Sequence, residues 1–136
     1  MTTPTSLTSP SNVTAPTKFV QAAHETYAYR RFGGGSSHPL VFLQHFMGTL
    51  DNWDPAVTDA LASRREVILF DNAVVGRSTG EVPVTVQGMA ALALAFMDAL
   101  GLERVDLLWF SLGGMVAQEI ARVRVRACAL LTRRPR

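Results

Sequence analysis

The stretch VDLLWFSLGGMVAQ, residues 105–118, decides the fold class of this 136-residue chain. Residues 105–110 form a short, continuous apolar run, which is typical of a strand buried on both faces of a parallel sheet. Ser111 follows this run directly, and Gly113 and Gly114 then open a stretch with a helical pattern. A serine in the tight turn between a buried strand and a helix projects its hydroxyl above the edge of the sheet. The stretch therefore predicts an α/β fold that carries a candidate nucleophile.

Two apolar runs of the same kind precede this stretch, LVFLQH (40–45) and EVILFDN (66–72). Further upstream, KFVQAA (18–23) and ETYAYRRF (25–32) are short segments rich in aromatic and β-branched residues, and the turn-forming GGGSSHP follows them. We therefore predict an antiparallel pair of strands, followed along the chain by parallel strands.

Helical patterns separate the apolar runs. Asp54 and Pro55 supply an N-cap and a proline at the first helical position, so we predict a helix through about Ser63. VQGMAALALAFMDALG (86–101) is nearly apolar all round in its middle, which predicts a helix that packs deep against the sheet and ends at Gly101. The alternation of strands and helices predicts right-handed crossovers in an α/β sheet.

The composition divides the chain into three parts. Residues 2–17 are almost entirely Thr, Ser, Pro and small residues, so we expect residues 1–17 to form a disordered tail. Residues 18–121 hold the predicted domain. The last sixteen residues carry six arginines and no acid, whereas residues 1–120 carry seven basic and all eleven acidic side chains. The excess of positive charge is therefore confined to the C-terminal segment.

Nothing in the sequence predicts a nucleic-acid or membrane partner. The arginine-rich segment has no interleaved aromatic side chains and no binding motif. No run reaches the roughly 18 apolar residues of a membrane span, and the N-terminus shows no basic start followed by an apolar core. The single Cys128 fits a reducing compartment. We therefore expect a cytoplasmic protein.

Ser111 is the residue whose surroundings point to chemistry. The N–H of Leu112 would lie at a helix N-terminus, where unpaired donors and the helix dipole favour an anion such as the oxygen of a tetrahedral intermediate. A second donor is expected from the N–H of Phe46, in the loop after the first parallel strand. The alternative, that Ser111 only caps the helix and that the glycines ease packing, is equally compatible with these four residues alone.

Three motifs in this order, QHFMGTLDNW, FDNAVVGRSTG and VDLLWFSLGGMVAQEIA, resemble the α/β-hydrolase superfamily. The similarity covers about residues 18–121 and is closest to small bacterial esterase, perhydrolase and haloperoxidase-like or carbon–carbon hydrolase members. It implies the N-terminal part of an α/β-hydrolase fold, with Ser111 as the nucleophile and Phe46 and Leu112 as the backbone donors of the oxyanion hole. The implied supporting residues of the loop and the elbow are His45, Gly48, Gly113 and Gly114.

The resemblance implies acyl transfer to water on a small-molecule ester or related acyl or carbon–carbon substrate, with no metal and no organic cofactor. The chain departs from the family pattern G-x-S-x-G at its first glycine, which is Trp109 here. We expect an indole at this position to displace the helix or bend the strand, and overpacking of this kind typically costs about 1 to 3 kcal/mol. On this interpretation, Trp109→Gly raises the thermal midpoint.

The catalytic partners of Ser111 are missing from their expected places. A serine hydroxyl needs a base to remove its proton, and in this fold the acid and the histidine follow the serine along the chain. The histidines are His24, His38 and His45, and no acid follows Glu119. His45 could act as the base only with its ring within about 2.6 to 3.2 Å of Ser111, but its family counterpart shapes the oxyanion loop.

The segment 122–136 has two interpretations. VRACALL resembles the next parallel strand of the family, although thirteen residues are close to the minimum for a crossover. The arginine-rich ending favours a truncation or a change of reading frame. We therefore expect a serine hydrolase by ancestry, inactive or very weak as this chain. The alternative is a non-catalytic fragment or interaction module that binds another chain, or a second copy, through an exposed sheet edge.

Overall fold

A computed structural model describes residues 11–22, 24–35, 38–44, 48–72, 76, 78–79, 83–124 and 128–131. Its elements run in the chain order β1 (Lys18–Ala22), β2 (Glu25–Phe32), β3 (Leu40–Leu43), the 3-10 turn η1 (Leu50–Asn52), α1 (Pro55–Ala62), β4 (Val67–Phe70), α2 (Val86–Ala99), β5 (Val105–Trp109), α3 (Gly113–Val123) and β6 (Cys128–Leu131).

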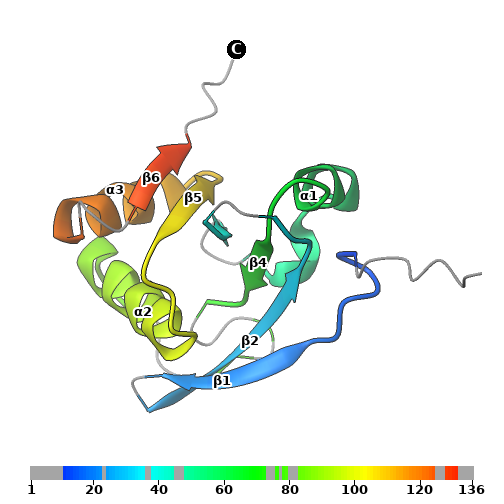
Figure 1. Cartoon of the computed structure of the whole chain (residues 1–136). Helices are drawn as coiled ribbons and strands as arrows, with labels where there is room; N and C mark the ends of the chain where they lie inside the picture. The colour runs from blue at the N-terminus through cyan, green and yellow to red at the C-terminus, as the bar shows by residue number, and fades with distance from the viewer. Residues whose placement is uncertain are drawn as a thin grey trace, which may run out of the picture.

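The strands form one mixed sheet with the order β1-β2-β4-β3-β5-β6 (Figure 1). The β1–β2 and β2–β4 pairs are antiparallel, and the β3–β4, β3–β5 and β5–β6 pairs are parallel. The predicted antiparallel pair followed by parallel strands with crossover helices is therefore confirmed. The parallel order also brings the carboxyl ends of β3, β4 and β5 to one edge of the sheet, where a site is expected in an open α/β sheet.

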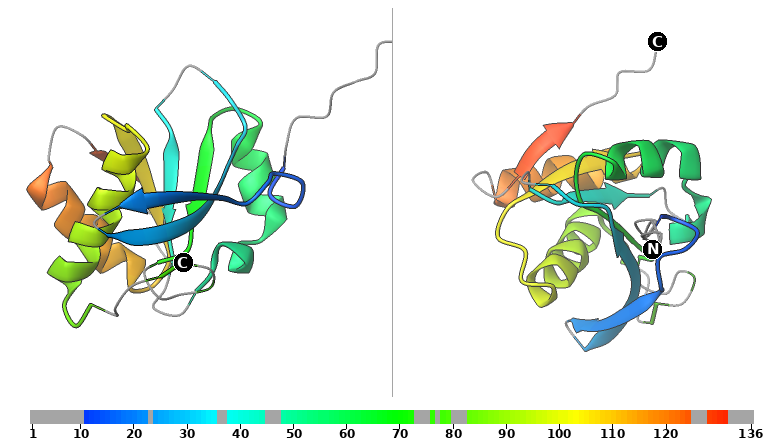
Figure 2. Two further views of the ribbon diagram at one scale, coloured as in Figure 1. Left: turned by 90° about the horizontal axis from the view of Figure 1, so that it is seen from below. Right: turned by 45° about the vertical axis from the view of Figure 1, so that its right-hand side comes forward.

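Helices cover both faces of the sheet, α2 and α3 on one side and α1 on the other (Figure 2). The two faces bury separate apolar clusters. Val41 and Leu43 of β3 join the cluster under α2 and α3, whereas Leu40 and Phe42 join the cluster under α1. Successive side chains of a strand point to opposite faces, so a strand covered twice must be apolar throughout. This explains why the parallel strands were recognisable as continuous apolar runs.

The helix limits follow the capping residues. The Asp54 carboxylate accepts a hydrogen bond from the Ala56 N–H at 2.9 Å, and Pro55 occupies the first turn of α1. At α2, the Thr85 hydroxyl accepts from the Gly88 N–H at 2.9 Å. Gly101 follows the end of α2 with a φ of +71°, a conformation that glycine adopts without strain. Both predicted helices are confirmed within two residues at their ends.

Order begins earlier than the composition suggested. Disorder was expected through residue 17, but residues 11–17 are described, and Asn12 is 3% exposed. The Asn12 side-chain amide donates to the Thr58 hydroxyl at 3.0 Å, and its backbone N–H donates to the Asp59 carboxylate at 2.8 Å. These hydrogen bonds attach residues 11–17 to α1 and bury Asn12, although the segment contains few apolar side chains. The expected boundary at residue 17 is therefore too late, and residues 1–10 lie outside the described part.

The segment after α3 contributes a strand. Residues 128–131 form β6 and pair in parallel with β5, with Val105 opposite Cys128 and Leu108 opposite Leu131. Residues 110–127 connect the two strands, which is more than the minimum of about a dozen residues for a parallel crossover. The parallel strand predicted in this segment is therefore present, the expected truncation or change of reading frame stays a prediction, and residues 132–136 lie outside the described part.

Candidate active site

Ser111 lies directly beyond the carboxyl end of β5. The ladder with β3 continues to the last residue of the strand, where Leu43 is opposite Trp109, and the Phe110 N–H donates to the Leu43 carbonyl at 3.0 Å. Ser111 itself has a φ of +56° and is exposed. A residue other than glycine in this left-handed region costs about 1 to 3 kcal/mol and is concentrated at functional sites. The serine is therefore held in a strained turn with its side chain open to solvent.

Gly113 lets α3 begin close to the sheet. A Cβ built on Gly113 would lie 2.9 Å from the Leu43 carbonyl carbon and nearer still to its oxygen, closer than real side chains approach. Any other residue would push the helix away from β3. The first turn is closed by hydrogen bonds from the Gly113 N–H to the Phe110 carbonyl at 3.1 Å and from the Gly114 N–H to the Ser111 carbonyl at 2.9 Å. The glycine requirement predicted at this position thus has a steric cause.

The Leu112 N–H is available as an anion donor. Leu112 is the N-cap residue of α3, with helical dihedral angles and no side-chain cap. Within the described part of the chain, no hydrogen-bond acceptor lies on its N–H. An unpaired donor at the start of a helix whose dipole places partial positive charge there favours a negative ligand. Leu112 follows Ser111 immediately, so this donor and the hydroxyl belong to the same turn.

Trp109 is accommodated beside Gly114. A Cβ built on Gly114 would lie 2.8 Å from both Cδ1 and Nε1 of the Trp109 indole, so the ring edge occupies the space that a side chain would need. The indole is half-buried and packs against the apolar cluster under α2 and α3. Because the β3–β5 ladder is intact through Trp109, the expected bending of the strand does not occur. The absence of a side chain at position 114 makes room for the ring.

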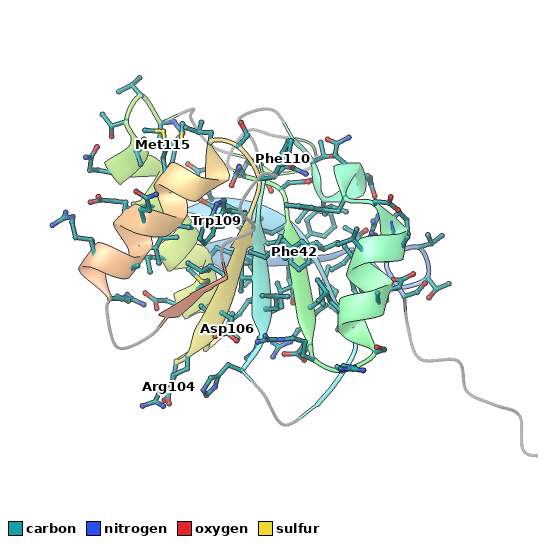
Figure 3. All side chains as sticks on the ribbon, turned by 90° about the horizontal axis from the view of Figure 1, so that it is seen from above. Phe42, Arg104, Asp106, Trp109, Phe110 and Met115 are labelled. Atoms are coloured by element: carbon teal, nitrogen blue, oxygen red, sulfur yellow. The ribbon has the colours of Figure 1, made fainter. Side chains whose placement is uncertain are left out.

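Apolar side chains flank the serine on the exposed surface. Phe110 is 59% exposed and Met115 is 56% exposed. Both lie toward the carboxyl ends of the strands, whereas Arg104 and Asp106 lie at the opposite end of the sheet (Figure 3). Phe110 and Met115 therefore present apolar surface at the end of the sheet where Ser111 lies.

The loop after β3 is fastened to the end of β4 by Asp71, which is 2% exposed. Its carboxylate accepts from the Leu50 N–H at 2.6 Å. A Cβ on Gly76 would lie 2.8 Å from the Asp71 Cγ, so this glycine packs directly over the carboxyl group. Sequence reasoning assigned Asp71 no role, although an acid directly after a buried strand was the available signal.

The other predicted site residues are only partly described. Gly48 is buried and precedes Thr49. The Thr49 hydroxyl accepts a hydrogen bond from the Asp51 N–H at the start of η1, and the Thr49 N–H donates to the Asn52 side-chain oxygen. His45 and Phe46 lie outside the described residues. The roles assigned to His45 and to the Phe46 N–H therefore remain predictions.

No described histidine is placed to act on Ser111. His38 precedes β3, at the edge of the sheet opposite the serine. His24 lies in the β1–β2 turn, and β4 and β3 separate β2 from β5. Three strand spacings correspond to about 14 Å, far beyond the 2.6 to 3.2 Å that proton transfer needs. Among the described residues, no group of three or more His, Cys, Asp or Glu could hold a metal ion.

The described arginines of the C-terminal part are paired with acids. Arg124 forms two hydrogen bonds with Asp98 at the end of α2, one of them 2.7 Å long. This side-chain hydrogen bond holds the pKa of Asp98 below its ordinary value of 3.8. Arg122 pairs with Glu119 one turn earlier in α3 at 2.7 Å. The described part of this segment therefore presents neutralised pairs instead of a free basic patch. No helix in the described ranges has the length and apolar character needed to span a bilayer.

Comparison with known proteins places these observations in a family. The family model described as the alpha/beta hydrolase fold matches residues 38–133. A solved structure, the alpha/beta hydrolase fold protein from Chitinophaga pinensis, is 43% identical with a TM-score of 0.84 over 89% of this chain and 45% of that chain. A protein of Pseudomonas savastanoi pv. phaseolicola, named carbamate hydrolase RutD, is 32% identical over 63% of this chain and 34% of its own length.

A third relative is the dihydrolipoyllysine-residue acetyltransferase component of the acetoin cleaving system of Cupriavidus necator. It is 35% identical over 68% of this chain and 25% of its own length. The chain thus spans about a third of the RutD relative, a quarter of the acetyltransferase component and less than half of the solved structure.

Proposed function

The chain belongs to the alpha/beta hydrolase fold family, and from this we propose that Ser111 is the nucleophile of an acyl-hydrolase site. In the proposed reaction, the Ser111 hydroxyl attacks a substrate carbonyl and the Leu112 N–H stabilises the oxyanion that forms. Collapse of this tetrahedral intermediate breaks the bond to the leaving group, which departs with the proton that the serine has lost and leaves the acyl group on Ser111. The N–H of Phe46 is proposed as the second donor. Water then releases the acyl group from the serine, so the overall reaction is acyl transfer to water.

The observation that carries the proposal is the conformation of the turn. Ser111 has a φ of +56° between a strand that is hydrogen-bonded up to residue 110 and a helix whose first residue touches the neighbouring strand. A serine that only capped the helix would accept a backbone N–H with its side chain, but α3 has no side-chain cap. We therefore interpret the strained conformation of Ser111 as the one that exposes its hydroxyl next to the unpaired Leu112 N–H.

The 136 residues do not supply a base for this serine by the usual route. No histidine follows residue 45 in the sequence, and the two described histidines are remote from Ser111. We therefore propose little or no turnover by this chain, although the oxyanion donors and binding alone can supply about 10³ to 10⁴ over the uncatalysed reaction in a serine hydrolase. An added small base is expected to restore part of the missing step.

The proposed substrate is a small molecule with an ester or related acyl or carbon–carbon bond. The exposed Phe110 and Met115 favour an apolar group on the acyl side. With the single Cys128 unable to form an intrachain disulfide, a reducing compartment such as the cytoplasm is part of the proposal.

Labelling with a fluorophosphonate that carries an apolar alkyl chain tests this function. The folded chain is expected to take up one phosphonyl group, and Ser111→Ala is expected to take up none. Ser63→Ala is the matched control, because Ser63 is an exposed serine at the end of α1, remote from the turn. Absence of labelling even with added imidazole, in a sample shown to be folded, for example by its thermal transition, would refute the proposal.

A second candidate is an interaction module that uses the edge of the sheet. The supporting observation is that β6 is the last strand in the sheet order and pairs with β5 on one side only, within the described part of the chain. A strand edge with unpaired backbone groups promotes pairing with another chain. Sedimentation over a hundredfold range of concentration is expected to show reversible self-association, and a monomer throughout that range would count against this candidate.

A further inference from the structure

We infer that residues 11–17 form a latch that holds the corner between η1 and α1 (residues 50–59), and that release of the latch loosens this corner and the end of the loop after β3. The corner lies at the carboxyl edge of the sheet, because the Leu50 N–H donates to the carboxylate of Asp71, directly after β4. Ser111 follows β5 at the same edge. The consequence for Ser111 rests on the proposed function, whereas the hold of the latch on the corner does not.

One end of the latch is attached to the corner through Asn12. Its side-chain amide donates to the Thr58 hydroxyl at 3.0 Å and to the Trp53 carbonyl at 3.4 Å. Its backbone N–H donates to the Asp59 carboxylate at 2.8 Å. Asn12 is 3% exposed and Thr58 is fully buried, and the start of the described chain lies beside α1 in Figure 2. A single residue of the latch thus bonds both to α1 and to the residue that follows η1.

The other end of the latch is connected to η1 through a side chain of β2. The Arg30 guanidinium donates to the Thr17 hydroxyl at 3.1 Å and to the Asp51 carboxylate at 2.5 Å. The Arg30 side chain is 13% exposed, so it lies largely between the two segments that it joins. The latch therefore reaches the corner on both sides, at η1 and at α1.

The latch is attached mainly by polar contacts. Ala15 is the one side chain of residues 11–17 in the apolar cluster under α1, and Val13 is 76% exposed. The polar groups would bond to water after release, so each hydrogen bond contributes little net free energy, and the ordering of seven residues opposes attachment. The Thr58 hydroxyl also lies 3.3 Å from the Pro55 carbonyl, so it keeps an acceptor within α1 when the latch opens. We therefore expect the latch to open far more readily than the domain unfolds.

The corner is held from two directions while the latch is closed. Asp71 holds Leu50 on the side of the sheet, and Asn12 holds the residue after η1 and the first turns of α1 on the outer side. After release, the outer contacts of α1 are lost, so α1 is free to shift relative to η1. The loop after β3 ends at Thr49, the capping residue of η1, and such a shift therefore reaches this loop.

The test compares Asn12→Ala with Val13→Ala in the full 136-residue chain. Asn12→Ala removes both side-chain hydrogen bonds of the latch to the corner. Val13→Ala is the matched control, because it shortens a mostly exposed side chain at the next position of the same segment.

Hydrogen exchange of three backbone amides is measured in each variant. The Ala15 N–H, bonded to the Ser11 carbonyl at 2.7 Å, reports on the latch. The Asn52 N–H, bonded to the Thr49 carbonyl at 3.1 Å, reports on the corner. The Gly101 N–H, at the end of α2 on the other face of the sheet, is the reference for unfolding of the whole domain.

Asn12→Ala is expected to speed exchange at Ala15 and at Asn52 by the same factor, about tenfold, because one opening exposes both amides. Exchange at Gly101 is expected to stay unchanged, and Val13→Ala is expected to change none of the three. Faster exchange at Ala15 alone would show that the latch opens without loosening the corner. Unchanged exchange at both amides, or an equal increase at Gly101, would show that Asn12 does not hold a separate latch. Each of these results would overturn the inference.

If Asn12→Ala does not fold, Asp59→Ala decides the same question. This substitution removes the acceptor of the Asn12 N–H from a half-buried position of α1 and deletes no apolar contact. The same pattern of exchange at Ala15, Asn52 and Gly101 is expected, and unchanged exchange at Asn52 would overturn the inference.

Labelling kinetics separate the inference from the proposed function. The proposed function places the second oxyanion donor in the loop after β3, so Asn12→Ala is expected to lower the limiting rate of phosphonylation of Ser111 about threefold or more. The half-saturating probe concentration is expected to stay within twofold, and Val13→Ala to change neither quantity. An unchanged rate in a variant with faster exchange at Asn52 would overturn the consequence for Ser111. If the wild-type chain is not labelled even with imidazole, the proposed function fails, and the exchange data still decide whether the latch holds the corner.

Discussion

Ser111 and Gly113 show how single residues set the geometry of the turn. The serine takes a left-handed conformation that costs free energy, and the glycine next to Leu112 allows the helix to touch β3. A tight turn between strand and helix could be predicted from a serine before a glycine pair at the end of an apolar run, whereas a catalytic and a capping role for the serine were equally compatible with these residues. The space for the Trp109 indole could not be predicted from sequence, because it depends on the position of Gly114 in α3, after the turn.

Gly113→Ala is expected to destabilise the chain by about 1 to 3 kcal/mol, because the new methyl group overlaps the Leu43 carbonyl and must displace α3. Gly34→Ala is the matched control, since nothing lies within 4 Å of a Cβ at that position. Urea unfolding of both variants measures the difference. Equal free energies of unfolding would show that α3 can move away from β3 at no cost.

Tyr27 is buried in the apolar cluster under α2, and its hydroxyl has no hydrogen-bond partner within the described residues. Burial, with a smaller contribution from the Glu25 carboxylate, raises the pKa of Tyr27 from 10.0 to about 12. Removal of an unpaired buried hydroxyl recovers its desolvation cost, so Tyr27→Phe is expected to stabilise the chain by about 1 kcal/mol at neutral pH.

The same substitution changes the response to alkali. A raised pKa means that the folded state favours the protonated phenol. This contribution is fully present below pH 10 and is lost as the pH rises from 10 through 12. Tyr27→Phe should therefore lose less stability over this interval than the wild-type chain. Tyr29→Phe, which changes a neighbouring half-buried tyrosine, is the control. Parallel pH profiles for Tyr27→Phe and the wild-type chain would contradict this account.

At the scale of elements, periodicity and capping residues were sufficient for most of the fold. The parallel strands were recognisable because helices cover both faces, and α1 and α2 because their caps stand at the expected positions. The structure of residues 11–17 was not predicted, because the burial of Asn12 depends on Thr58 and Asp59 of α1, more than forty residues away. Contacts over such distances leave no local pattern in a sequence.

The pair between Arg124 and Asp98 joins the ends of α3 and α2. Arg124→Gln is expected to destabilise the chain by a few tenths of a kcal/mol at most at neutral pH, since both side chains are more than a third exposed and solvent screens them. The pKa of Asp98 is lowered in the folded state, so this contribution is present above the ordinary value of 3.8 and is lost as the pH falls through the lowered pKa.

Thermal unfolding of the wild-type chain and of Arg124→Gln between pH 7 and pH 2 measures this effect. The two midpoints are expected to converge in acid and also at high salt. Arg122→Gln is the control, because its pair with Glu119 lies within α3 and joins no second element. A difference in midpoint that persists at pH 2 would mean that Arg124 acts through packing and not through its charge.

At the scale of the whole molecule, the proposed active site is incomplete in the described structure. The proposed nucleophile, Ser111, and one proposed oxyanion donor share a turn, and the described histidines lie at other edges of the sheet. The sequence already indicated this imbalance, because the order of serine and histidine along the chain is visible without a structure. The position of Phe46, on which the second donor depends, lies outside the described residues.

The rate of phosphonylation at Ser111, located by mass spectrometry of the labelled peptide and measured with and without imidazole, tests the central claim most directly. A strained, exposed serine with no described base beside it is expected to react slowly alone and about tenfold or more faster with imidazole, since a positioned base is worth about 10² to 10⁴ in rate. Ser111→Ala should abolish the reaction in both conditions. Labelling that is absent with imidazole, or that falls on other serines of a folded chain, would contradict the account.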